Sequence, residues 1–158
     1  MVPGHAIESM WFQIHIAEVQ RETAVITRAA EAIHRHLEAG WDQKYEGLLL
    51  AIDADGRHDP AWHMADSKLW WPHTEALYAT LLAYKYSRAP WCLEWHERIR
   101  EYSFAHYPVP EHGEWRQRLD RQGKPLEEFV ALPVKDPFHL PRALILMLEL
   151  LEQLKSDG

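Results

Sequence analysis

The stretch Trp70–Ala76, with the sequence WWPHTEA, opens the helix from which the fold of this chain can be worked out. Proline is favoured in the first turn of a helix, where its missing N–H group is not needed. The apolar spacing that follows predicts a helix from about His73 to Ser87. His73 therefore stands at a helix start. Unpaired backbone N–H groups and the positive end of the helix dipole favour a neutral imidazole there, and a neutral imidazole can act as a base.

Two further histidines stand at equivalent places. His5 lies in Pro3–Glu8, PGHAIE, and His139 lies in Phe138–Arg142, FHLPR, each at the start of an apolar-periodic segment. Three histidines placed in this way in one short chain indicate an active site rather than scattered core residues.

Apolar spacing predicts five helices along the chain. The second helix is expected to end at Gly40 and the fourth to begin at Pro90, because glycine commonly ends helices and proline opens them. The last helix is apolar nearly all round, which indicates burial on several sides. The expected helices cover about residues 5–20, 22–39, 73–87, 90–107 and 140–155.

Two segments between the helices predict short β-hairpins. Leu48–Ile52 leads into the turn Asp53–Gly56, and Trp115–Leu119 leads into the turn Asp120–Gly123. The order of inner helix, outer helix and hairpin thus occurs twice before a final inner helix, and helical hairpins repeated in this way curve into a toroid. We expect an all-α, single-domain fold: an open arc of a toroid, with helices alternating between inner and outer layers. The three helix-start histidines would then lie at one end of alternate helices and face one concave surface.

Composition excludes several classes of function. The net charge is −7 and no patch of Lys and Arg stands out, so nucleic acid is not an expected partner. No signal peptide is recognisable, and the most apolar run, Ala143–Leu151, is too short to cross a membrane and is interrupted by Glu149. The single cysteine, Cys92, cannot form an internal disulfide, which is typical of a reducing cytosol. We expect a cytoplasmic protein without membrane contact.

The sequence carries no motif for a metal or a nucleotide cofactor. The HExxH string, the P-loop, the dinucleotide-binding glycines and the G-x-S-x-G elbow are all absent, despite eleven histidines. Asp53–Gly56 faintly resembles the start of a calcium loop, but the Gly and Glu required further along such a loop are missing. We expect neither a metal nor a cofactor.

Two of the histidine motifs each allow a second explanation. Glu8 stands three residues after His5, so it can orient the imidazole, or the two can form an ordinary polar pair at a helix N-terminus. Arg142 stands three residues after His139. Its guanidinium can bind an anionic or polyhydroxyl ligand, or it can join neighbouring loops.

The tryptophans also have two explanations. Trp70 and Trp71 can stack on the C–H faces of a sugar while Glu75 holds its hydroxyls, or all three can pack a helix start. The same choice applies to all eight tryptophans, because aromatic side chains bury large areas in cores and also form sugar-binding surfaces.

Four segments together resemble the N-acylglucosamine 2-epimerase family. They are residues 3–8, 68–76, 113–121 and 138–142, and they follow the family's order and spacing over essentially the whole chain. The resemblance implies an (α/α)6 barrel and the chemistry of N-acylglucosamine 2-epimerases, cellobiose 2-epimerases and aldose–ketose isomerases. Family members are more than twice as long, so the resemblance implies that this chain is the C-terminal portion of such a barrel, with the N-terminal portion absent.

The resemblance also implies roles for particular residues. His5 and His139 match the family's two catalytic histidines, and Glu8 and Glu75 match carboxylates that hold the substrate and tune those histidines. The Trp-Pro-His form at residues 71–73 is more similar to the N-acylglucosamine branch than to the cellobiose branch, which has Gln at the third place. Further residues expected to bind substrate are Trp70, Trp71, His73 and Arg142.

The implied chemistry is proton transfer at C2 of a monosaccharide or an N-acylated sugar. In the open-chain form, one neutral histidine removes the acidic C2 proton and leaves an enediolate. A second histidine on the opposite face returns a proton and inverts C2, whereas return of the proton to C1 gives a ketose. Helix N-termini and Arg142 would stabilise the enediolate. Because a cut ring exposes apolar helix flanks, the expected partner is a second copy of the chain or a complementary N-terminal fragment.

Two other functions stay open. The chain can be a non-catalytic binding or assembly fragment derived from such an epimerase, since part of the ring is missing. Glycoside hydrolysis in an α/α toroid is less well supported, because the helix starts carry histidines rather than pairs of carboxylates.

Overall fold

The computed structural model describes residues 1–56, 60–127 and 138–156. The five predicted helices are all present in this part of the chain, with ends that differ from the expected ones by a few residues. They are α1 (Pro3–Gln20), α2 (Thr23–Gly40), α3 (Trp70–Ser87), α4 (Pro90–His106) and α5 (His139–Ser156), with a short 3-10 turn, η1, at Pro110–His112.

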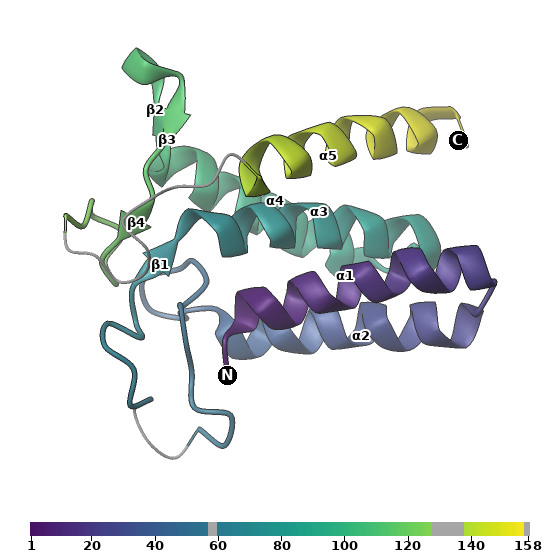
Figure 1. Ribbon diagram of the computed structural model, residues 1–158, viewed down its shortest axis with the longest axis horizontal. Coiled ribbons are helices and arrows are strands. Elements are labelled where there is room, and N and C mark those ends of the chain that lie inside the picture. The colour runs from purple at the N-terminus through teal and green to yellow at the C-terminus, as the bar shows by residue number, and fades with distance from the viewer. Residues whose placement is uncertain (57–59, 128–137, 157–158) are drawn as a thin grey trace.

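The helices form two layers, as the alternation of inner and outer helices predicted. In Figure 1, α3 lies between α1 and α5, and these three helices form one layer. In the other layer, α2 packs on α1 and α4 packs on α3. Because helices surround α3, it is buried along almost its whole length from Trp70 to Ala83. This central position explains why apolar side chains occur on every face of the helix.

Two small antiparallel sheets lie at the helix ends, and one of the predicted hairpins is wrong. Leu48–Ile52 forms no strand. Leu48 makes an isolated bridge with Trp41. The N–H groups of Leu50 and Ala51 donate to the carbonyl groups of Ser67 and Ala65. The segment therefore pairs with the part of the chain that directly precedes β1 (Lys68–Leu69) and α3. A hairpin signal is local, so it carries no information on so distant a partner.

The second predicted hairpin is divided between two sheets. Strand β3 (Glu114–Trp115) pairs with β2 (Pro108–Val109), whereas β4 (Arg118–Leu119) pairs with β1 (Lys68–Leu69). The expected turn after β4 is present, with the N–H of Gly123 donating to the carbonyl of Asp120. The pairing of β1 with β4 joins the segment before α3 to the segment after α4.

A buried lysine links the segments that follow α2, precede α3 and follow β4. Lys68 is fully buried, and its Nζ donates to the carbonyl oxygens of Tyr45 and Arg121, at 3.3 and 2.6 Å. The same Nζ lies 3.6 Å from Oδ2 of Asp42, which also accepts from Nε of Arg121 at 2.9 Å. A buried ammonium needs partners of this kind to offset its loss of hydration.

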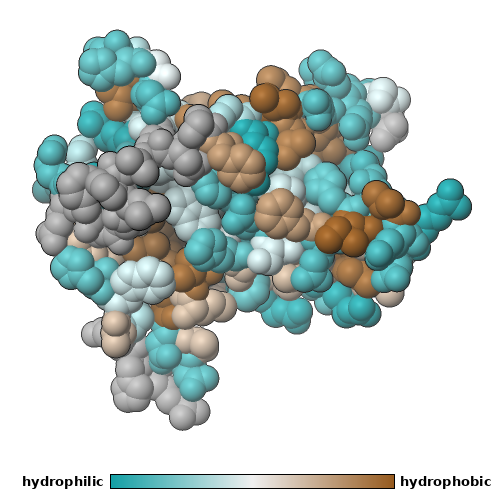
Figure 2. All heavy atoms as spheres, viewed as in Figure 1, coloured by the Kyte–Doolittle hydropathy of each residue, from teal (hydrophilic) through white to brown (hydrophobic). Residues whose placement is uncertain are grey.

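The edge helices expose apolar side chains. The last helix was expected to be buried on several sides, but α5 buries only Ala143, Met147 and Leu150, because it packs mainly on α3. Figure 2 shows apolar side chains on the viewed face over both edge helices. The exposed residues are Phe12, Ile16 and Val19 of α1 and Leu144, Ile145, Leu148 and Leu151 of α5. Even so, none of the helices in the described residues is long and apolar enough to cross a membrane.

Candidate active site

The first turns of α1 and α3 meet at a glycine. A Cβ atom on Gly4 would lie only 2.8 Å from Cβ of Pro72 and 2.9 Å from the Trp71 ring, so the two helices approach as closely as they do because residue 4 has no side chain. This approach sets the ring centroids of His5 and Trp71 4.7 Å apart. On α5, the ring of His139 lies 5.2 Å from the same indole. Trp71 therefore contacts both of the histidines that the sequence singled out as catalytic.

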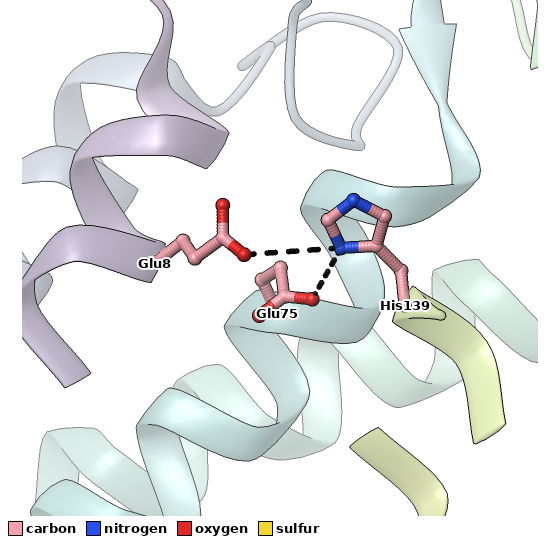
Figure 3. A group of neighbouring side chains, drawn as sticks. All are labelled: Glu8, Glu75 and His139. Carbon is pink, nitrogen blue, oxygen red and sulfur yellow. Dashed lines mark hydrogen bonds and ion pairs between the residues drawn. The ribbon is translucent and has the colours of Figure 1, made fainter. Parts of the chain in front are cut away.

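Four charged or titratable side chains from three helices meet beside Trp71. Nδ1 of His139 lies 2.7 Å from Oε1 of Glu75, which is 1% exposed. Nη2 of Arg142 donates to that same oxygen at 2.6 Å and to Oε1 of Glu8 at 3.0 Å. Figure 3 shows both carboxylates turned towards Nδ1, with Glu8 at 4.0 Å. We call His139, Glu75, Glu8 and Arg142 the carboxylate–histidine cluster.

The geometry fixes the tautomer of His139. An ionised carboxylate only accepts hydrogen bonds, so the short contact with Glu75 requires the proton on Nδ1. In the neutral imidazole, Nε2 is then the basic nitrogen. The formal charges of the cluster add to −1 with a neutral His139 and to zero when it is protonated.

The same atoms have the spacing of a possible metal site. One ligand atom from each of Glu8, Glu75 and His139 lies within 4.8 Å of the others. Arg142 already donates to the two carboxylate oxygens that a cation would need, and its own charge would repel a divalent ion. These residues therefore fit the guanidinium better than they fit a metal.

The structure does not bring His73 to this cluster. Its imidazole is fully buried, Nε2 accepts from the N–H of Leu48 at 2.9 Å, and Nδ1 lies 2.7 Å from the carbonyl of Leu69. Burial lowers the pKa of His73 to about 3, so the ring stays neutral. Positions two apart on a helix point about 200° apart, so His73 and Glu75 lie on opposite faces of α3. The expectation that all three helix-start histidines face one surface is thus met by His5 and His139 only.

The two adjacent tryptophans also lie in different surroundings. Trp70 is 2% exposed, and its ring meets that of His139 edge-on at 5.6 Å. Trp71 is only partly buried, so its ring has the accessible surface that stacking on a ligand requires.

Sequence reasoning missed one member of the site. The apolar spacing of the first helix favours a core position for Trp11, and this side chain is 4% exposed. Its Nε1 also donates to Oε2 of Glu75 at 2.8 Å. The available signal was its place three residues after Glu8, which puts both side chains on one face of α1.

Comparison with known proteins places the chain in a family. The family model described as N-acylglucosamine 2-epimerase (GlcNAc 2-epimerase) matches residues 1–143. This chain belongs to the N-acylglucosamine 2-epimerase family. The resemblance inferred from the four sequence segments is therefore confirmed.

Curated members of this family match nearly the whole chain. The N-acylglucosamine 2-epimerase of Bos taurus is 38% identical over 158 residues, which are 98% of this chain and 36% of the bovine protein. The Homo sapiens N-acylglucosamine 2-epimerase is 35% identical, with 98% and 36% covered. The chain thus spans little more than a third of the length of the relatives it matches.

Solved structures show the same fold. A D-mannose isomerase superposes with a TM-score of 0.81 at 22% identity over 94% of this chain and 37% of that one. A cellobiose 2-epimerase from Bacillus thermoamylovorans superposes with a TM-score of 0.75 at 24% identity, with the same coverage. The expected fold class, part of an (α/α)6 toroid, is confirmed. In place of the two expected hairpins, the described residues form two small antiparallel sheets.

Proposed function

We propose that this chain carries the proton-transfer site of a sugar 2-epimerase or aldose–ketose isomerase of the N-acylglucosamine 2-epimerase family. The observation that carries the proposal is the hydrogen bond between Nδ1 of His139 and the buried carboxylate of Glu75. The rings of His139 and His5 both contact the indole of Trp71. A monosaccharide or N-acylated sugar is the proposed substrate, in keeping with the names of the relatives. A reducing cytoplasm suits the chain, whose single cysteine, Cys92, is buried.

The mechanism begins with the acidic C2–H of the open-chain sugar. Nε2 of His139 takes this proton, and the C–H electrons form an enolate, which is an enediolate where C2 carries a hydroxyl. The positive charge gained by His139 balances the −1 formal charge of the carboxylate–histidine cluster. His5 returns a proton to the opposite face of C2, which inverts that carbon. If the proton returns to C1 of a sugar whose C2 carries a hydroxyl, the product is a ketose.

Electrostatics stabilise the negative enediolate. The N-termini of α1, α3 and α5 all lie at the site, and helix N-termini carry positive partial charge. Arg142 is already bound to Glu8 and Glu75, so it contributes its charge and holds the two carboxylates in place. Glu8 accepts a hydrogen bond from Arg142. We propose that its negative charge balances the positive charge of this guanidinium.

We further propose that the chain is the C-terminal portion of its barrel and needs the rest of the ring for turnover. It spans 36% of the length of its curated relatives. Much of the rate of such a reaction comes from positioning the substrate, and a partial wall positions it poorly. The exposed apolar side chains of α1 and α5 would contact either the complementary portion or a second copy.

The test is a ring-complete chimera, in which these 158 residues follow the preceding part of the bovine relative. We expect proton NMR in D₂O to show loss of the C2–H signal and appearance of an epimer or ketose for at least one of N-acetylglucosamine, mannose, glucose and cellobiose. The isolated chain should show little or no turnover. A folded chimera that exchanges the C2 proton of none of these sugars would contradict the proposal.

A non-catalytic binding or assembly role is the second candidate, favoured by the apolar faces of α1 and α5. It predicts a stable complex between this chain and a partner, with no exchange at C2 in the complex or in the chimera. The same NMR assay therefore separates the two candidates.

A further inference from the structure

We propose that Trp11 is a positioning residue, which keeps the carboxylate of Glu75 directed at His139 and prevents both of its oxygens from pairing with the guanidinium of Arg142. The inference rests on the proposed role of His139 as the base. It adds a residue that acts through Glu75 rather than on the substrate.

The hydrogen bonds of Glu75 show what Trp11 does. Oε1 accepts from both His139 and Arg142, and Oε2 accepts from the indole Nε1 of Trp11 at 2.8 Å. Glu75 is 1% exposed and Trp11 is 4% exposed, so water has little access to replace the indole. With donors on both oxygens, the plane of the carboxylate is fixed.

Arg142 offers Glu75 a competing arrangement. Its Nε is buried and has no hydrogen-bond partner among the described residues. A guanidinium favours a paired contact, in which two N–H groups meet the two oxygens of one carboxylate. Glu75 could form that pair by turning Oε2 towards Arg142, and the indole N–H opposes this turn.

Aromatic rings also hold Arg142 where it is. Its guanidinium carbon lies 3.8 Å from the ring centroid of Phe138 and 5.0 Å from that of Trp11. Trp11 therefore restrains both partners of the competing contact. Its N–H group holds Glu75, and its ring helps to hold Arg142. Without it, Glu75 turns into the paired contact, and His139 loses the acceptor that fixes its Nδ1–H tautomer.

Nitrogen NMR of the ¹⁵N-histidine-labelled chain tests this inference directly, because it reports the tautomer of His139 without requiring turnover. We expect the unmodified chain to show one tautomer at His139, protonated on Nδ1. Trp11→Phe keeps an aromatic ring but removes the N–H donor, and it should give a mixture of tautomers. A single Nδ1–H tautomer in Trp11→Phe would overturn the proposal.

Trp41→Phe is the matched control. Trp41 is also buried, at 3% exposure, but its Nε1 has no hydrogen-bond partner among the described residues. Loss of this indole should leave the tautomer of His139 unchanged. An equal change in both variants would mean that loss of packing, rather than the missing N–H, disturbs the site, and would overturn the proposal.

A measurement on the unmodified chain keeps the inference falsifiable if Trp11→Phe does not fold, and a double variant extends the test if it does. In the unmodified chain, the indole N–H of Trp11 should exchange with D₂O more slowly than the indole N–H of exposed Trp62, and equal exchange would contradict a bond to a buried carboxylate. Arg142→Lys removes the guanidinium fork, so in that background Trp11→Phe should restore the single tautomer. Failure of the sugar assay with these NMR results intact would overturn the proposed function alone.

Discussion

Gly4 shows how one missing side chain positions a histidine. An alanine normally stabilises a helix by about 1 kcal/mol relative to glycine. At this position the added Cβ would lie 2.8 Å from Pro72, whose ring cannot move aside, and 2.9 Å from Trp71. The steric cost therefore exceeds the helical gain.

We predict that Gly4→Ala lowers the free energy of unfolding by about 1–3 kcal/mol, the usual cost of overpacking. Urea unfolding followed by circular dichroism measures this change. Ser9→Ala, at an exposed position of the same helix, is the control and should stay close to the unmodified chain. A Gly4→Ala variant as stable as the parent would show that the two helices can separate at no cost.

His73 makes the stability of the chain depend on pH. Its folded pKa, about 3, lies below the value near 6.5 of an unfolded histidine. The unfolded chain therefore binds more protons between these values, so the contribution of His73 is complete above pH 6.5 and is lost as the pH falls towards 3. Burial also lowers the pKa values of His15, His36 and His96, with the same sign.

We predict that the free energy of unfolding falls with decreasing pH below 6.5, with His73 contributing about 1.4 kcal/mol for each pH unit. Urea titrations at several pH values should show a smaller slope in His73→Gln than in the parent chain. His36→Gln, at a partly exposed position, should change the slope less. Equal slopes in the parent and His73→Gln would contradict the prediction.

The two histidines that we propose to be catalytic, His5 and His139, should differ from each other in solvent exchange. In the ring-complete chimera, His5→Ala and His139→Ala should each abolish epimerisation, because each histidine serves one face of C2. The remaining histidine can still remove the proton from the epimer whose C2–H faces it, so deuterium enters without inversion. Proton NMR in D₂O measures both effects. Wild-type epimerisation in either variant would contradict the two-base mechanism.

Among the elements, α5 supplies two of the four residues of the carboxylate–histidine cluster, but it is less well packed than α3. It supplies His139 and Arg142, but it packs mainly on α3 and buries a single stripe. The helix α3, which supplies Glu75 and Trp71, is buried along almost its whole length. Local opening therefore costs less free energy at α5 than at α3.

We predict that hydrogen exchange, followed by mass spectrometry, is fastest for α5 and slowest for α3 among the inner helices of the isolated chain. In the ring-complete chimera, α5 should exchange more slowly, because the added helices cover its exposed face. Equal protection of α5 and α3 in the isolated chain would show that the apolar face of α5 is already covered.

For the whole molecule, the open arc should associate. Phe12, Ile16 and Val19 on α1, together with four apolar residues on α5, are exposed, and patches of this kind usually mark an interface. We predict a dimer of the isolated chain by light scattering. Ile16→Glu combined with Leu148→Glu should give a monomer with unchanged helical content, since both side chains are more than half exposed. A monomer over a wide concentration range in the parent chain would contradict this prediction.

The sequence by itself determined the helices, their alternation and the family. Periodicity and the Pro and Gly signals near helix ends are local, so they predicted α1 to α5 to within a few residues. The resemblance singled out His139, Glu75 and Glu8, and the spacing after His139 singled out Arg142; the structure brings the four together.

Only the tertiary structure decided which way particular side chains face and which distant segments pair. His73 and His139 have the same local signature, but α3 is surrounded by helices and α5 is not, so one histidine is buried among backbone groups and the other meets carboxylates. The sheet that joins Lys68 to Leu119, and the bond from Trp11 to Glu75, link positions far apart in the chain. Such contacts depend on how helices pack, and packing is a property of the assembled fold rather than of any one segment's spacing.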